Sequence, residues 1–171
     1  DRVLTNVANL TGEIELALKG QSDSPVAGAL TGLDLAVGRL QGTITQVNVM
    51  TVDDSAAILT IIAAYLEDSE FNVVASERDG RRAVQKFEEM RPDIVLLDLK
   101  MPGIDGMAIL KKVKQTRPEI EVIVLTGHGS EKDRERCMQL GAFAYLQKPV
   151  DIDLLSDTLK KAHARIRKKP S

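Results

Sequence analysis

Apolar and polar positions along residues 47–171 form blocks that switch between two periods. Short, mainly apolar runs, such as Val47–Val52 and the uninterrupted Ile94–Leu97, are typical of strands that are buried on both faces. Between these runs lie longer segments whose apolar residues recur every three or four positions, as in helices that cover a sheet. We expect strands at 47–52, 71–75, 94–97, 122–125 and 142–146, and helices at 55–66, 80–90, 106–115, 131–140 and 152–167. This alternation predicts an α/β fold with helices on both faces of a parallel sheet.

Residues 1–46 follow the helical period alone. Two apolar stripes at heptad spacing are separated by a break at residues 20–25, and their members are Val3, Val7, Leu10, Ile14 and Ala17, then Val26, Leu30, Leu33, Val37, Leu40 and Ile44. The pattern predicts an antiparallel helical hairpin that forms a domain separate from residues 47–171. Two short helices bury little surface by themselves, so the hairpin needs a partner. We expect a homodimer through this hairpin, and docking on residues 47–171 is the alternative.

Composition narrows the class of protein. The 171 residues are 43 % hydrophobic and 28 % charged, with a formal net charge of −2, which gives no sign of binding to nucleic acid. Basic residues gather near the C-terminus, but without interleaved aromatic residues we expect the solvated end of a helix. No apolar run is long enough to insert into a membrane.

The single cysteine, Cys137, rules out an internal disulfide and fits a reducing, cytoplasmic location. We expect its thiol to be buried on a helix rather than reactive. The chain starts at Asp1 without a methionine, which is consistent with a fragment of a longer protein.

Polar residues with candidate chemistry stand at the ends of the predicted strands. Asp53 and Asp54 follow the first strand, Asp98 the third, Thr126 the fourth, and Lys148 the fifth. In such a sheet the carboxyl ends of the strands meet at one edge, where ligands bind. Three carboxylates repel one another unless a cation lies among them, and a hard cation such as Mg²⁺ suits oxygen ligands. A metal and a lysine around an aspartate also suit phosphoryl transfer to that aspartate.

Four motifs at these strand ends carry a resemblance to a known family. They are Val-Asp-Asp-Ser at 52–55, Leu-Leu-Asp-Leu-Lys-Met-Pro-Gly-Ile-Asp-Gly at 96–106, Leu-Thr-Gly-His-Gly at 125–129 and Tyr-Leu-Gln-Lys-Pro at 145–149. Residues 47–171 resemble the receiver domain of response regulators in two-component signalling. The resemblance implies a doubly wound, flavodoxin-like sheet of order 2-1-3-4-5. It also implies a phosphorylation-controlled switch that is phosphorylated by a histidine kinase or a phosphotransfer protein.

By this resemblance Asp98 is the phosphoacceptor. Asp53, Asp54, Asp98 and the backbone carbonyl of Lys100 would hold Mg²⁺, and Lys148 would contact the phosphoryl oxygens. The family catalyses only its own phosphoryl transfer and dephosphorylation, so we expect no further enzyme activity. Output would pass through protein–protein contacts.

The resemblance assigns two residues to the switch itself. Thr126 would move toward the phosphoryl group, and Tyr145 would rotate inward behind it. Lys100 and His128 are candidates for rate tuning, and His128 would tune hydrolysis of the phosphate. Each residue also has a structural interpretation: Thr126 as an ordinary strand end, Tyr145 as a half-buried strand aromatic, and His128 as an exposed loop histidine.

Two other classes of protein share part of this pattern. Phosphatases of the haloacid dehalogenase type also use a strand-end aspartate with Mg²⁺, but they need a second aspartate at the position of Lys100. A receiver-shaped interaction module that is not phosphorylated is the alternative function. The hairpin is faintly similar, at residues 9–18, to the dimerisation hairpin of sensor histidine kinases, although no histidine precedes His128.

Overall fold

The structure is a computed structural model that describes residues 46–168. The hairpin, its proposed dimer contact and its status as a separate domain fall on residues 1–45, outside the described residues, and so do residues 169–171.

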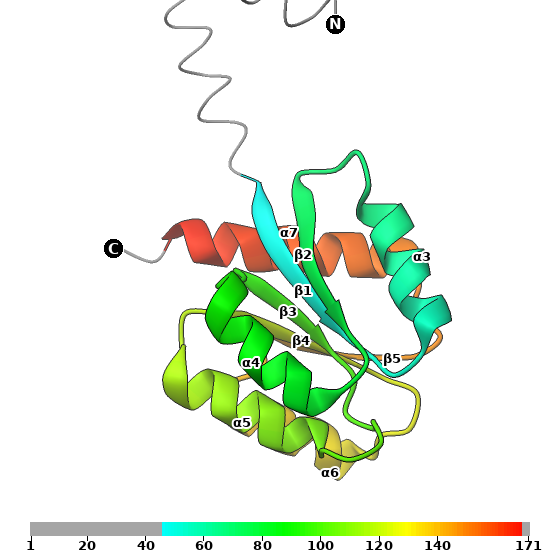
Figure 1. The fold of residues 1–171 in the computed structure, drawn as a ribbon, viewed down its shortest axis with the longest axis vertical. Coiled ribbons are helices and arrows are strands. Elements are labelled where there is room, and N and C mark those ends of the chain that lie inside the picture. The colour runs from blue at the N-terminus through cyan, green and yellow to red at the C-terminus, as the bar shows by residue number, and fades with distance from the viewer. Residues whose placement is uncertain (1–45, 169–171) are drawn as a thin grey trace, which may run out of the picture. The chain divides into compact units, whose positions relative to one another are not determined.

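Strands and helices alternate strictly along the described residues (Figure 1). In chain order they are β1 (Val47–Val52), α3 (Ala56–Leu66), β2 (Phe71–Glu77), α4 (Gly80–Met90), β3 (Ile94–Leu97), α5 (Gly106–Thr116), β4 (Glu121–Thr126), α6 (Glu131–Gln139), β5 (Ala144–Gln147) and α7 (Ile152–Lys168). The sheet has five strands in the order β2-β1-β3-β4-β5, and every neighbouring pair is parallel. The predicted doubly wound, flavodoxin-like fold with strand order 2-1-3-4-5 is confirmed.

Each face of the sheet is covered by its own set of helices, as Figure 1 shows. Helices α3 and α7 cover one face, where Ile94 and Ile123 of the central strands pack against Leu159. Helices α4, α5 and α6 cover the other face, where Val95 and Val124 are part of the second core. Successive side chains of a strand point to opposite faces, so a strand buried on both faces is mainly apolar. This is why β3 reads Ile-Val-Leu-Leu.

Polar caps begin the helices at the edge of the sheet where the strands end. The Ser55 side chain caps α3, Asp105 caps α5, and Ser130 caps α6 in a reciprocal capping box with Asp133. These side chains satisfy backbone N–H groups that have no partner inside the helix. The loops that carry the candidate residues therefore run directly into fixed helix starts.

The edge strands differ most from the prediction. Strand β2 continues to Glu77, beyond the predicted end at residue 75. Strand β5 begins at Ala144 instead of residue 142, because the Ala142 N–H donates to the Cys137 carbonyl at the end of α6, 3.0 Å away. Cys137 is fully buried on α6, as expected. Among the described helices, none combines the length and the apolar character needed to cross a membrane.

Candidate functional site

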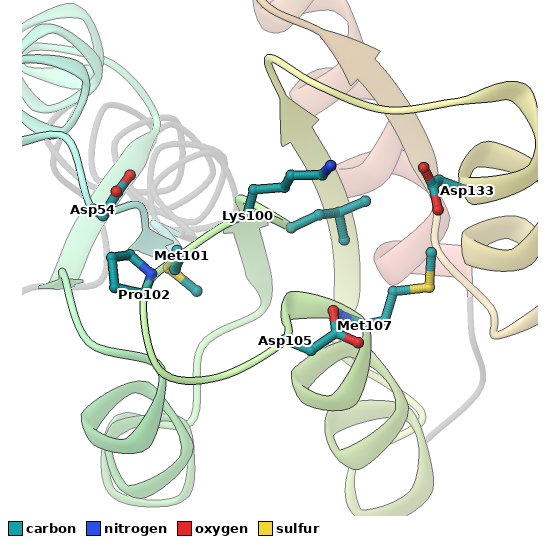
Figure 2. A pocket seen from close by; sticks show the side chains of 8 residues that line it. Asp54, Lys100, Met101, Pro102, Asp105, Met107 and Asp133 are labelled. Carbon is teal, nitrogen blue, oxygen red and sulfur yellow. The ribbon is translucent and has the colours of Figure 1, made fainter.

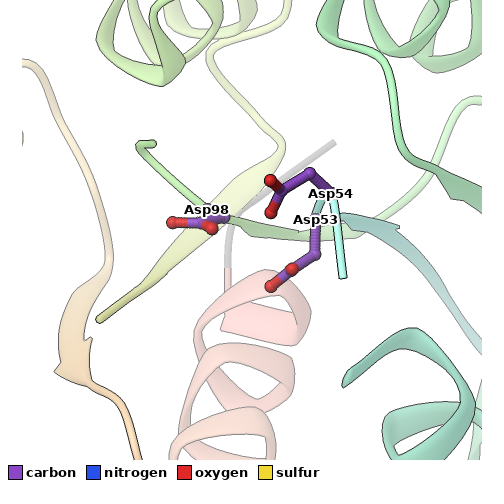
Figure 3. Close-up of side chains that lie close together, drawn as sticks. All are labelled: Asp53, Asp54 and Asp98. Carbon is purple, nitrogen blue, oxygen red and sulfur yellow. The ribbon is translucent and has the colours of Figure 1, made fainter. Parts of the chain in front are cut away.

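Three aspartates meet at the carboxyl edge of the sheet. Asp53 and Asp54 follow β1, and Asp98 follows the neighbouring strand β3 (Figure 3). One carboxylate oxygen from each lies within 4.8 Å of the others. Asp53 and Asp98 are 3 % and 6 % exposed, whereas Asp54 is half-buried. Backbone N–H groups orient the two buried carboxylates: Ser55 N–H donates to Asp53 at 2.9 Å, and Lys100 N–H donates to Asp98 at 3.1 Å.

Lys148 joins two of these carboxylates. Its Nζ lies 2.5 Å from Asp53 Oδ2 and 3.2 Å from Asp98 Oδ2. Its backbone N–H donates to the Thr126 carbonyl at 2.8 Å, and its peptide bond to Pro149 is cis. Burial alone would lower the pKa of Lys148, but the hydrogen bonds and charges of Asp53 and Asp98 outweigh it and raise that pKa above 10.5. The side chain is therefore a cation at neutral pH.

The donor atoms at this edge suit a hard divalent cation. Carboxylate oxygens from three residues converge there, and Lys148 neutralises only part of their charge. Cations of this kind prefer oxygen ligands and keep some of their water. The cluster also opens toward solvent, because Asp54 and the loop after β3 line a cavity of about 530 Å³.

Figure 2 shows that cavity, whose other walls are Met101, Pro102, Asp105, Met107 and Asp133. The Lys100 side chain extends away from Asp54 toward the side where Asp133 lies (Figure 2). Lys100 therefore contributes its backbone N–H to Asp98, while its side chain points away from Asp54.

A close approach of backbones holds the loop that carries Asp98. A Cβ atom on Gly106 would lie 2.5 Å from the Asp98 carbonyl oxygen and 2.5 Å from Leu99 Cα. The Gly106 N–H donates to the Leu99 carbonyl at 3.0 Å. Only glycine allows this contact, so Gly106 fixes the start of α5 against the site. The motif at 96–106 contains Gly106, but its spacing alone does not reveal this role.

The two candidate switch residues lie on neighbouring strands. Thr126 ends β4 and is fully buried, and Tyr145 lies on β5, paired in register with Val124. Both hydroxyl oxygens are buried, and neither has a hydrogen-bond partner in the described part of the chain. His128 differs from them: it is exposed, and no described hydrogen bond or ion pair joins it to the site.

Comparison with known proteins identifies response regulators as relatives of this chain. The family model of the response regulator receiver domain matches residues 49–160. The transcriptional regulatory protein ZraR of Escherichia coli (strain K12) is 37 % identical over 118 residues, which are 69 % of this chain and 26 % of that protein. The chemotaxis protein CheY of Listeria monocytogenes is 34 % identical over 113 residues, which are 66 % of this chain and 95 % of that protein.

Solved structures agree with these relatives. The signal receiver domain of a putative Luxo repressor protein from Vibrio parahaemolyticus has a TM-score of 0.68 at 29 % identity, covering 71 % of this chain and 93 % of that one. The CheX-CheY-BeF3-Mg+2 complex from Borrelia burgdorferi gives a TM-score of 0.65 at 28 % identity, covering 68 % of this chain and 89 % of that one.

This chain spans about a quarter of the length of the transcriptional regulatory relatives. The part that matches them is the part that carries the aspartate cluster and Lys148. The family match, the strand order and the relatives agree, and the chain belongs to the response regulator receiver domain family of two-component signalling.

Proposed function

We propose that this chain is a phosphorylation-controlled switch in which Asp98 accepts a phosphoryl group from the phosphohistidine of a histidine kinase or phosphotransfer protein. The position of Lys148 supports this function most, because its ammonium contacts Asp98 at 3.2 Å and Asp53 at 2.5 Å. Asp98 lies at the end of a central strand and is held by the Lys100 N–H. A carboxylate oriented in this way can attack a phosphorus atom in line.

The transfer exchanges one bond for another. A carboxylate oxygen of Asp98 bonds to phosphorus, the bond from phosphorus to the donor histidine nitrogen breaks, and the leaving imidazole takes up a proton. Lys148 stays charged near neutral pH and stabilises the negative charge on the equatorial phosphoryl oxygens. We expect no enzyme activity beyond this transfer and the later loss of the phosphoryl group.

Mg²⁺ is the proposed cofactor. Asp53, Asp54, Asp98 and the backbone carbonyl of Lys100 would hold it, and when bound it neutralises charge on the phosphoryl group. The oxygen-rich cluster supports this choice, as does the relative from Borrelia burgdorferi, whose structure is a complex with BeF3 and Mg+2.

The proposed output is a change of surface for protein–protein contact. Thr126 would turn its hydroxyl toward the phosphoryl group on Asp98, and Tyr145 would hold the inward position. We propose that Lys100 and His128, at the rim, tune the rate. A hydroxyl that is buried without a partner gains by finding an acceptor, which supports the choice of Thr126.

Binding of beryllofluoride, a mimic of the phosphoryl group, tests this function. We expect fluorine NMR to show a bound signal that needs both Mg²⁺ and Asp98. Asp54→Asn should abolish binding at the same Mg²⁺ concentration, whereas Asp157→Asn, an exposed change on α7, should not. If no signal appears at any Mg²⁺ concentration, the chain is a receiver-shaped interaction module instead.

A further inference from the structure

The short loop between β4 and α6 makes an unusually close contact with Tyr145. A Cβ atom built on Gly129 would lie 1.6 Å from Tyr145 Oη and 2.9 Å from Tyr145 Cζ. The same atom would lie 3.1 Å from Thr126 Cγ2. The tyrosine hydroxyl therefore occupies the volume in which every residue other than glycine places its first side-chain atom.

The backbone of Gly129 does not itself require glycine. Positive φ angles among the described glycines occur at Gly103 and Gly141, and not at Gly129. Gly127, in the same loop, is different again, because a Cβ there would meet only Lys148 Cβ at 4.0 Å. What matters at Gly129 is thus the missing side chain, and an alanine there would be a purely steric probe.

Space, rather than a hydrogen bond, holds the tyrosine ring in this position. Tyr145 Oη is buried and has no hydrogen-bond partner among the described residues. The ring packs against the core beneath α4, α5 and α6. Oη is the far end of a side chain, whereas the atoms around Gly129 belong to a loop that leads straight into the capping box of α6. A clash here would therefore move the ring and not the loop.

We propose that Gly129 is a positioning residue: its missing side chain forms the seat for the inward ring of Tyr145 beside Thr126. A side chain at position 129 and an inward ring exclude each other. The seat itself stands on contacts alone. Its meaning for signalling rests on the proposed function, in which Thr126 and Tyr145 form the switch.

Ionisation of Tyr145 gives a direct readout of the seat. Burial raises the pKa of Tyr145 above 10.0; Asp133, Cys137 and Glu131 add to the rise, and Arg134 opposes it. The chain has two tyrosines and no tryptophan, so in a Tyr65→Phe background the near-ultraviolet absorbance of tyrosinate reports on Tyr145 alone.

In that background we expect Gly129→Ala to lower the titration midpoint of Tyr145, because the ring moves into water. The matched variant Gly127→Ala adds the same methyl group two residues away and should leave the midpoint unchanged. Equal midpoints in the parent and both variants would overturn the proposal.

A stability comparison keeps the proposal testable if Gly129→Ala folds poorly. The cost of Gly129→Ala is measured by urea unfolding with Tyr145 present and again in a Tyr145→Ala background. We expect a loss of stability only when the ring is present, because in the Tyr145→Ala background the added methyl group has no hydroxyl to displace. The same loss in both backgrounds would contradict the seat.

The link to the switch has its own readout. With the ring expelled, we expect Gly129→Ala to bind beryllofluoride with Mg²⁺ several-fold more weakly than Gly127→Ala. Equal affinities would overturn the role of the seat in the switch. If none of the variants, nor the parent, binds beryllofluoride, the proposed function has failed, and the tyrosine titration still decides whether Gly129 forms the seat.

Discussion

At the scale of single residues, the main feature of the site is the close approach of three carboxylates. Asp53, Asp54 and Asp98 place carboxylate oxygens within 4.8 Å of one another, and Lys148 contacts two of the three carboxylates. Like charges at such distances repel by one to several kcal/mol, depending on the local dielectric. The cluster therefore lowers the stability of the fold when no cation is present, and its oxygens suit a cation.

Asp54→Asn tests whether repulsion among the three carboxylates lowers stability and whether the same carboxylates bind a cation. We expect the variant to be more stable than the parent by about 1 kcal/mol in EDTA, because one of the repelling charges is gone. Added Mg²⁺ should stabilise the parent through binding to the folded state and leave the variant unchanged. Urea unfolding with and without Mg²⁺ measures both effects.

Asp157→Asn is the matched control for Asp54→Asn, since it removes an exposed negative charge away from the cluster. Its stability should stay within about 0.5 kcal/mol of the parent, with an unaltered response to Mg²⁺. Destabilisation of Asp54→Asn in EDTA, together with a full response to Mg²⁺, would contradict the explanation that the three carboxylates repel one another and bind the cation.

Cys137 predicts a pH dependence of stability. Burial raises the pKa of its thiol from 9.0 to about 11. The folded chain then holds the thiol proton more tightly than the unfolded chain does. This contribution to stability is complete below pH 9.0 and disappears as the pH rises through about 11.

Cys137→Ala should therefore lose stability less steeply than the parent between pH 9.0 and about 11. Urea unfolding at several pH values measures the two slopes. Both proteins carry Tyr145→Phe in this comparison, because Cys137 itself adds to the raised pKa of Tyr145. Parallel curves across this range would show that the thiol titrates alike in the folded and unfolded chains.

At the scale of elements, the central strands were predicted more accurately than the edge strands. Strands β1 and β3 have the predicted bounds, because β3 is apolar throughout, β1 is apolar except at Asn48 and Thr51, and an aspartate follows each strand directly. Strands β2 and β5 lie at the edges of the sheet and contain polar or half-buried positions. Their ends are set by hydrogen bonds to neighbouring elements, which a pattern of apolar residues does not contain.

The charged residues of the site were predictable from the sequence, but the close backbone contacts around it were not. Strand ends and motif spacing were enough to nominate Asp53, Asp98 and Lys148, which the structure brings together. The close approaches at Gly106 and Gly129 were not predictable, because each depends on how two elements meet in space.

Glu121 is an element-scale feature that the apolar pattern missed. This first residue of β4 is fully buried, and its carboxylate lies 3.8 Å from Lys114 of α5 and 3.4 Å from Arg165 of α7. Arg165 also lies over the Phe143 ring, 5.6 Å from its centre. The carboxylate therefore joins helices from the two faces of the sheet, at the edge opposite Asp98.

We expect Glu121→Ala to reduce the free energy of unfolding by about 2 kcal/mol, because it removes a fully buried carboxylate that is paired with Lys114 and Arg165. The neighbouring Glu119→Ala removes an exposed carboxylate and should cost less than about 0.5 kcal/mol. Beryllofluoride binding by folded Glu121→Ala should match the parent, since the site lies at the other edge. A weakened affinity would show coupling across the sheet.

At the scale of the whole molecule, the site exists only when the fold is complete. Lys148 is 95 residues from Asp53 and 50 residues from Asp98 along the chain, and the sheet brings the three together. The receiver domain family match covers residues 49–160 and so contains this site, while the chain spans about a quarter of the larger regulatory relatives. Whatever the switch controls, its first event is proposed to occur at Asp98.

The intact mass of the protein after incubation with acetyl phosphate and Mg²⁺ tests that event most directly. We expect the parent to gain the mass of a single phosphoryl group, and neither Asp98→Asn nor a parent sample in EDTA to gain it. A parent that gains no mass, or an Asp98→Asn variant that gains as much as the parent, would contradict Asp98 as the phosphoacceptor.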